Sequence, residues 1–242
     1  MSYHVCVKST CCNALAASKI RAGKKLKSKK HNMSEKVTSK KKQKRESLLR
    51  QSFQLFTEKG FQNTSISDIA KNAGVAKGTF YLYFKDKYDL RNRLTIHEAS
   101  KLFFNAYNAF INENAPDSDE GIVSADVEEI IVFMMEHILD ELASNKPLLV
   151  FLNKNLSWGV FRNAFHGVPK EDEPDFNSLY RNILEKSPVK YRDPEIALFL
   201  IVELVGSAGY SSIIYGDPLD LEHLKPYLKR EIHNILKSHE RE

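Results

Sequence analysis

Residues 64–84, TSISDIAKNAGVAKGTFYLYF, contain the pattern that decides the fold of this chain. Ser65, followed by Asp68 three residues later, is typical of the capping box that starts a helix. Gly74 supplies the small residue that a tight turn between two helices requires. The stretch therefore predicts two short helices joined by a tight turn, an arrangement known as a helix-turn-helix.

The second of these helices has a distinctive outward face. Phe80 and Phe84 stand four residues apart, so both rings are expected to face inward. The residues then turned outward are Lys77, Gly78, Thr79, Tyr81 and Tyr83. A lysine can donate to guanine O6 and N7 in the major groove, while hydroxyl groups suit phosphates. The alternative is a helix pair that serves only structural packing, with Tyr81 half-buried in the core.

The flanking residues extend the pattern. Upstream, Leu48, Leu49, Ser52, Leu55 and Phe56 form an apolar stripe on a helix that ends at Gly60. The whole of residues 45–90 resembles the DNA-binding domain of the tetracycline-repressor (TetR) family. The matching features are FTEKGF at residues 56–61, SDIA at 67–70, AGV at 73–75, GTFY at 78–81 and YFKDK at 83–87.

The resemblance implies roles for individual residues. Lys77, Gly78 and Tyr81 occupy positions that face base edges in this family. Positions that hold phosphates are occupied by Thr79, Tyr83 and Lys87, with Ser67 as a further contact. Asp86 is expected to cap the next helix, whose first amides would grip a phosphate together with Lys87. The alternative for Lys87 is simple solvation.

Charge is distributed very unevenly. Residues 1–45 hold 14 Lys or Arg and one acidic residue, residues 46–90 have a net charge of +1, and residues 91–242 a net charge of −9. We interpret residues 1–44 as a basic, disordered tail. The cations at the end of this tail, together with Arg45, are candidates for DNA phosphate contacts. Alternatively, the tail is only a solvated arm, or translation of the natural protein starts at Met33.

All three cysteines lie among the first 12 residues, which excludes a disulfide-stabilised scaffold. No second ligand pair at zinc-like spacing follows them, so no metal site is expected. The sequence also lacks a phosphate loop, a nucleophile elbow and an HExxH motif, and we expect neither enzymatic activity nor a cofactor. No run of 18 or more apolar residues occurs, so no membrane span is expected and the chain is placed in the cytoplasm.

After residue 90 the apolar spacing is helical throughout, so the fold class is all-α, with about nine helices. The expected helices cover residues 87–111, 124–143, 147–166, 175–186, 195–215 and 218–237. Asp193 is expected to cap the helix that starts at Pro194, and Pro226 to kink or split the last helix. Residues 91–242 are interpreted as an effector-binding and dimerisation domain.

The segment 196–215 is apolar nearly all round, with small residues in its second half. In the TetR family the last two helices of each subunit form a four-helix dimer bundle. The resemblance therefore implies a homodimer through residues 195–215 and 218–237. Its two recognition helices would lie about 34 to 36 Å apart on double-stranded DNA and read a palindromic operator.

The family also encloses a small-molecule effector in this domain, in a mainly apolar pocket. The candidate pocket residues are Phe104, Tyr107, Met134, His137, Trp158, Phe161 and Glu203, with Glu136 and Asn155 as further polar anchors. Aromatic residues at helical spacing are more often core, and Glu203 could equally lie at the dimer interface.

These features favour a repressor that a hydrophobic or amphipathic effector releases from DNA. The alternative is a ligand-independent architectural DNA-binding protein, or an adaptor that recruits a protein partner.

Overall fold

The computed structural model describes residues 39–114, 126–157, 159–160, 162 and 176–241. The chain divides into two compact units, Met1–Leu48 and Leu49–Glu242, and each is described by itself. In the first unit, residues 39–48 are helical, and in the second unit residues 49–58, which precede α2, are helical as well. The described part of the second unit is built from helices, with an isolated antiparallel bridge between Tyr191 and Glu240. The predicted all-α fold is confirmed.

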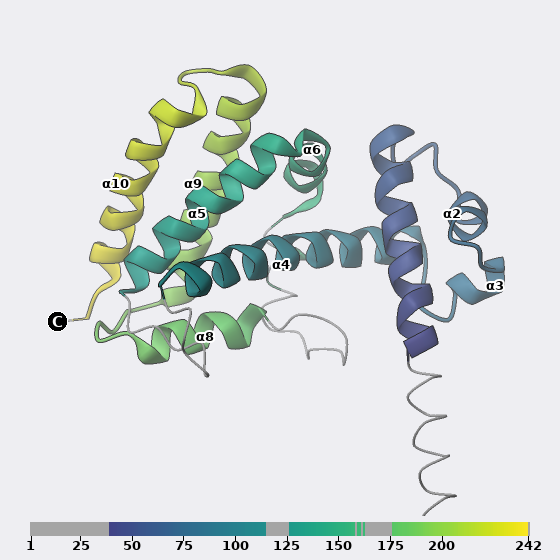
Figure 1. Cartoon of the computed structure of the whole chain (residues 1–242), viewed down its shortest axis with the longest axis horizontal. Coiled ribbons are helices and arrows are strands. Elements are labelled where there is room, and N and C mark those ends of the chain that lie inside the picture. The colour runs from purple at the N-terminus through teal and green to yellow at the C-terminus, as the bar shows by residue number, and fades with distance from the viewer. Residues whose placement is uncertain (1–38, 115–125, 158, 161, 163–175, 242) are drawn as a thin grey trace, which may run out of the picture. The chain divides into compact units, whose positions relative to one another are not determined.

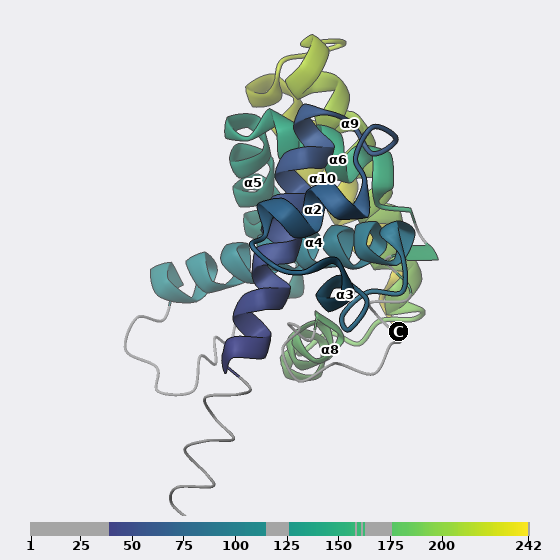
Figure 2. The ribbon, with the colours of Figure 1, turned by 90° about the vertical axis from the view of Figure 1, so that its right-hand side faces the viewer.

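The predicted helix-turn-helix is present, as α2 (Ile66–Asn72) and α3 (Lys77–Phe80). Figure 2 turns these two helices toward the viewer. The capping box is confirmed: Asp68 N–H donates to Ser65 Oγ at 3.1 Å, and Ser65 N–H donates to Asp68 Oδ2 at 3.1 Å. In the turn, Gly74 adopts φ +68°, a left-handed conformation that favours glycine because it has no Cβ.

The α3 helix is a single turn of four residues, and the chain then continues as turns through Tyr83. Phe84 N–H still donates to the Phe80 carbonyl at 3.0 Å, which keeps the two rings one turn apart. Both rings are buried, as their spacing predicts, and their centroids lie 5.6 Å apart. Burial of these rings orients the short recognition segment between them.

Figure 1 shows the remaining helices. Their bounds are α4 Lys87–Asn114, α5 Val127–Ser144, α6 Lys146–Asn155, α8 Phe176–Lys186, α9 Pro194–Tyr215 and α10 Leu221–His239. Asp86 caps α4 as expected, since Asp89 N–H donates to Asp86 Oδ1 at 2.8 Å. The expected domain boundary at residue 90 falls inside α4, which runs across it without a break.

Two expected helix ends and one expected helix cap are wrong. The helix expected to continue to residue 166 ends at Asn155, whose side chain donates to the Phe151 carbonyl at 2.7 Å, and Leu156 is extended. Asp193 has φ 46° and makes no side-chain cap to α9. The last helix starts at Leu221, because Asp220 rather than Pro218 provides its cap, and it continues unsplit through Pro226.

The main core lies between α4, α5, α9 and α10, which pack against one another in pairs. Its largest fully buried members include Phe110 of α4, Leu139 of α5 and Ile232 of α10. Gly209 lets α9 approach α5 closely: a Cβ at this position would lie 2.5 Å from Leu139 Cδ2. Glycine at position 209 therefore permits close packing of α9 against α5, whereas a Cβ at Gly206 would meet nothing within 4 Å.

Candidate functional site

The predicted DNA-contact residues gather on α2, α3 and the turn that follows α3. Lys77, Gly78 and Ser67 are exposed, while Thr79 and Tyr83 are half-buried. Desolvation raises the pKa of the Tyr83 hydroxyl above its ordinary value, so this group stays a neutral hydrogen-bond donor at pH 7. The structure thus presents one cation and several hydroxyl groups on one short segment.

Tyr81 is 53% exposed, so its ring is not part of the core. The ring contacts Phe80 edge-on, with centroids 5.4 Å apart, and this contact supports the ring from one side. Gly78 is equally informative, because a Cβ built there would meet nothing within 4 Å. The packing of the chain therefore does not require glycine at this position. With glycine there, no side chain projects from the surface next to Lys77.

Lys87, a predicted phosphate contact, has partners within the chain. Its Nζ donates to the carbonyl oxygens of Phe61 and Thr64, at 2.7 and 2.9 Å, and lies 4.4 Å from the centroid of the Phe61 ring. The ammonium group therefore holds the loop between the first helix and α2 against the start of α4. Lys87 is therefore not freely solvated, and its contact with DNA phosphate stays a prediction.

Arg45 belongs to the first unit, where it is half-buried on the helical segment 39–48. Lys40, Lys41, Lys42 and Lys44 are exposed on the same segment. The structure does not place this unit against α3, so the predicted DNA contact of Arg45 stays a prediction. The tail before residue 39, with Met33 and the cysteines, lies outside the described residues.

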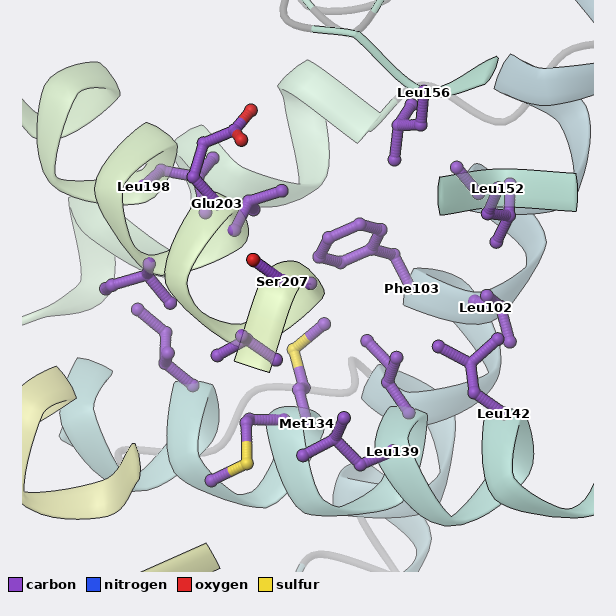
Figure 3. A pocket seen from close by; sticks show the side chains of 18 of the residues that line it. Leu102, Phe103, Met134, Leu139, Leu142, Leu152, Leu156, Leu198, Glu203 and Ser207 are labelled. Carbon is purple, nitrogen blue, oxygen red and sulfur yellow. The ribbon is translucent and has the colours of Figure 1, made fainter. Parts of the chain in front are cut away.

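A cavity of about 360 Å³ lies within the second unit, between α4, α5, α6, α8 and α9 (Figure 3). Its walls are mainly leucine, isoleucine and methionine side chains. Met134 and Glu203 line it, as predicted. The polar side chains in the lining are Asn153, Ser157, Tyr180, Glu203, Ser207 and Tyr210.

Other predicted pocket residues lie elsewhere. Phe104 and Tyr107 are half-buried on α4 but are not part of the described lining. Tyr107 packs against the main core, and desolvation raises its pKa. His137 stacks on the Phe133 ring with centroids 6.1 Å apart, away from the cavity. The predicted positions Trp158 and Phe161 lie outside the described residues.

The two further anchors also have other roles. Glu136 forms an ion pair with Lys229 of α10 at 2.7 Å, and Asn155 caps the end of α6. The lining residues that the sequence reasoning missed are mostly aliphatic, among them Leu102, Leu142, Leu149, Leu152 and Leu198. One signal was available: residues 203, 206, 207 and 210 are small or polar at helical spacing on an otherwise apolar helix.

Two contacts connect the cavity walls to their surroundings. Tyr180 Oη donates to the Pro194 carbonyl at 2.7 Å, which ties α8 to the start of α9, and burial raises the pKa of Tyr180. On α6, Leu149 and Leu152 line the cavity, while Phe151 packs edge-on against Phe53 at 5.5 Å between centroids. The α6 helix thus contacts both the cavity and the helix that precedes α2.

Residues 48–94 match the model of the family described as "Bacterial regulatory proteins, tetR family". Over 42 residues the chain is 52% identical to the uncharacterized HTH-type transcriptional regulator YvdT of Bacillus subtilis, which covers 17% of this chain and 22% of that protein. It is 46% identical over 46 residues to the HTH-type transcriptional regulator AcrR of Shigella flexneri, covering 19% of this chain and 21% of that protein. Residues 48–94 therefore form a DNA-binding domain of the TetR family.

Solved structures of TetR-family proteins share the fold beyond this segment. A putative regulator from Shewanella sp. PV-4 superposes with a TM-score of 0.56 at 17% identity, covering 82% of this chain and 99% of that one. A second, from Vibrio parahaemolyticus, gives a TM-score of 0.52 at 23% identity and covers 82% and 100%. The sequence matches to the curated relatives span only about a fifth of their length, within the TetR DNA-binding domain.

Proposed function

We propose that this TetR-family chain is a transcriptional repressor in the cytoplasm that binds a palindromic operator as a homodimer and is released by a small hydrophobic or amphipathic effector. One observation carries the proposal: α4 belongs to both functional regions. Its first residues lie in the family-matched segment 48–94, and Ala99, Leu102 and Phe103 of the same helix line the cavity.

On the DNA side, Lys77 and Tyr81 contact base edges, and Gly78 lets the backbone approach the groove. Thr79, Tyr83 and Ser67 donate to phosphates. The net charge of residues 46–90 is only +1, so affinity depends on these few placed groups and on the basic tail.

On the effector side, a ligand that fills the cavity moves α4 and α6 relative to each other. The contact between Phe151 and Phe53 carries the movement of α6 to the helix that precedes α2. Release requires the ligand to bind the DNA-incompetent state more tightly, with a coupling free energy of about 1 to 3 kcal/mol. An architectural DNA-binding protein or an adaptor has no need of a cavity of this size, so we favour the ligand-responsive repressor.

The dimer is proposed to form through α9 and α10. The α9 helix is apolar and long enough to span a membrane by length and composition, and only 28% of its most apolar stretch is buried within the described chain. Ile196 is 51% exposed and Leu200 is 41% exposed, one turn apart on the same face. A second copy of α9 and α10 would bury the side chains of Ile196 and Leu200. Light scattering at micromolar concentration is expected to give twice the chain mass, and a monomer would contradict the proposal.

The regulatory proposal is tested by selecting duplexes from a random DNA pool and titrating the winning sequence with candidate effectors. Selected duplexes are expected to contain an inverted repeat, and an effector is expected to weaken their binding. A Lys77→Ala variant should change the preferred base at one position of each half-site. Selection of unrelated sequences by the wild-type protein would contradict operator recognition.

A further inference from the structure

The charge balance of the cavity lining is one-sided. Among the described residues that line it, Glu203 is the only charged side chain, and no lysine, arginine or histidine is present. Glu203 is exposed and forms no ion pair within the described part of the chain. Figure 3 shows Glu203 at the edge of the group of lining side chains, with its carboxylate pointing away from Phe103 and Met134.

We infer that the effector is an amphipathic cation, whose apolar part fills the cavity and whose positive charge lies beside the Glu203 carboxylate. The inference rests on the proposed function of the cavity as an effector site. Leucine, isoleucine and methionine walls accept an aliphatic or aromatic body without hydrogen bonds. A single carboxylate at the mouth attracts a cation and repels an anion.

The neighbours of Glu203 strengthen the assignment. Ser207 follows one turn later on the same face of α9 and also lines the cavity. Tyr180 and Tyr210 are the phenols in the described lining, and desolvation raises the pKa of each, so both are neutral at pH 7. An anionic headgroup would meet the carboxylate and find no cation in the described lining to compensate for it. A carboxylate or phosphate ligand is therefore disfavoured.

The test compares three probes with the same ten-carbon chain and different headgroups: decyltrimethylammonium, 1-decanol and decanoate. Binding to the full chain is measured by calorimetry at pH 7, below micelle-forming concentrations and without DNA. The wild-type protein is expected to bind the cation about fivefold more tightly than the alcohol, as for a partly exposed ion pair, and decanoate most weakly. In Glu203→Gln the cation and the alcohol should bind within about twofold of each other.

The matched control is Glu185→Gln, which removes an exposed carboxylate of α8 that does not line the cavity. It should keep the wild-type ranking. Filling the cavity with Ser207→Trp, or Leu152→Trp on the opposite wall, should weaken all three probes. Unchanged binding in both filled variants would mean adsorption to the exposed face of α9 and would overturn the inference.

Equal affinity for the three probes, or binding of none of them by the wild-type protein, would also overturn it. So would a Glu203→Gln variant that changes the dimer dissociation constant but keeps the preference for the cation, because Glu203 would then be an interface residue. Failure of the repressor proposal looks different. In that case the cation still binds with the Glu203-dependent preference, but operator DNA is not released.

Discussion

Replacing Lys87 with methionine separates a structural role from a DNA-binding role. The Nζ group donates two hydrogen bonds to the carbonyls of Phe61 and Thr64 and lies over the Phe61 ring. A hydrogen bond to a charged group contributes about 1.5 to 3 kcal/mol when buried. Because Lys87 is half-exposed and the freed carbonyls can be hydrated, we expect a total loss of about 2 kcal/mol. For a chain of this size the thermal midpoint should fall by about 4 to 8 °C.

The assay combines thermal denaturation followed by circular dichroism with DNA binding at several salt concentrations. If Lys87 is structural, the slope of log K against log salt on duplex DNA is unchanged in Lys87→Met. A phosphate contact would instead reduce the slope by about 0.9 for each subunit. Lys85→Met is the matched control, because Lys85 is exposed and two residues away, and its midpoint should not change. A wild-type midpoint with a flattened slope in Lys87→Met would refute the structural role.

Three further predictions follow from local geometry. Gly209→Ala should lower the free energy of unfolding by about 1 to 2 kcal/mol in urea titrations, because the new Cβ would lie 2.5 Å from the buried Leu139 side chain. Unchanged stability would mean that α5 and α9 can move apart at no cost and that their close packing does not need glycine. Ser65→Ala should lower the thermal midpoint at pH 7, and the difference should shrink, without vanishing, as the pH falls through the lowered pKa of Asp68: protonation weakens the hydrogen bond from the Ser65 hydroxyl to the Asp68 carboxylate but leaves the cap of the Asp68 N–H by Ser65 Oγ. In Phe151→Leu, the effector should weaken operator binding about fivefold less than in the wild-type protein, as measured by gel-shift titration. An effect of the same size as in the wild-type protein would show that the contact between Phe151 and Phe53 does not transmit the signal from the cavity.

Local patterns predicted local structure well. The capping box at Ser65, the left-handed turn at Gly74 and the buried pair of Phe80 and Phe84 depend on residues within four positions of each other. Such short spacings follow directly from helix geometry, so the sequence alone was sufficient. The cap of α4 by Asp86 was predicted for the same reason.

Features that depend on distant residues were not predicted. Lys87 meets carbonyls 26 and 23 positions earlier in the chain, and no periodicity reports such a contact. The cavity lining was predicted only in part, at Met134 and Glu203, because most of the lining is formed by aliphatic side chains that have no distinctive spacing in the sequence. Core and cavity walls have the same composition, so only packing distinguishes them. The early end of α6 was missed because the cap of its last turn by Asn155 has no strong sequence signal.

The partly covered α9 helix has a consequence for the cell. In the proposed dimer, a subunit that dissociates presents the face of Ile196 and Leu200 to chaperones and proteases. Newly made chains meet the same quality control until they find a partner, because binding of a second copy is what stabilises them by mass action. The dimer's association constant then determines how much of the regulator escapes degradation. When synthesis declines, the dimer concentration falls faster than the total concentration of the chain, and occupancy of the operator falls with it.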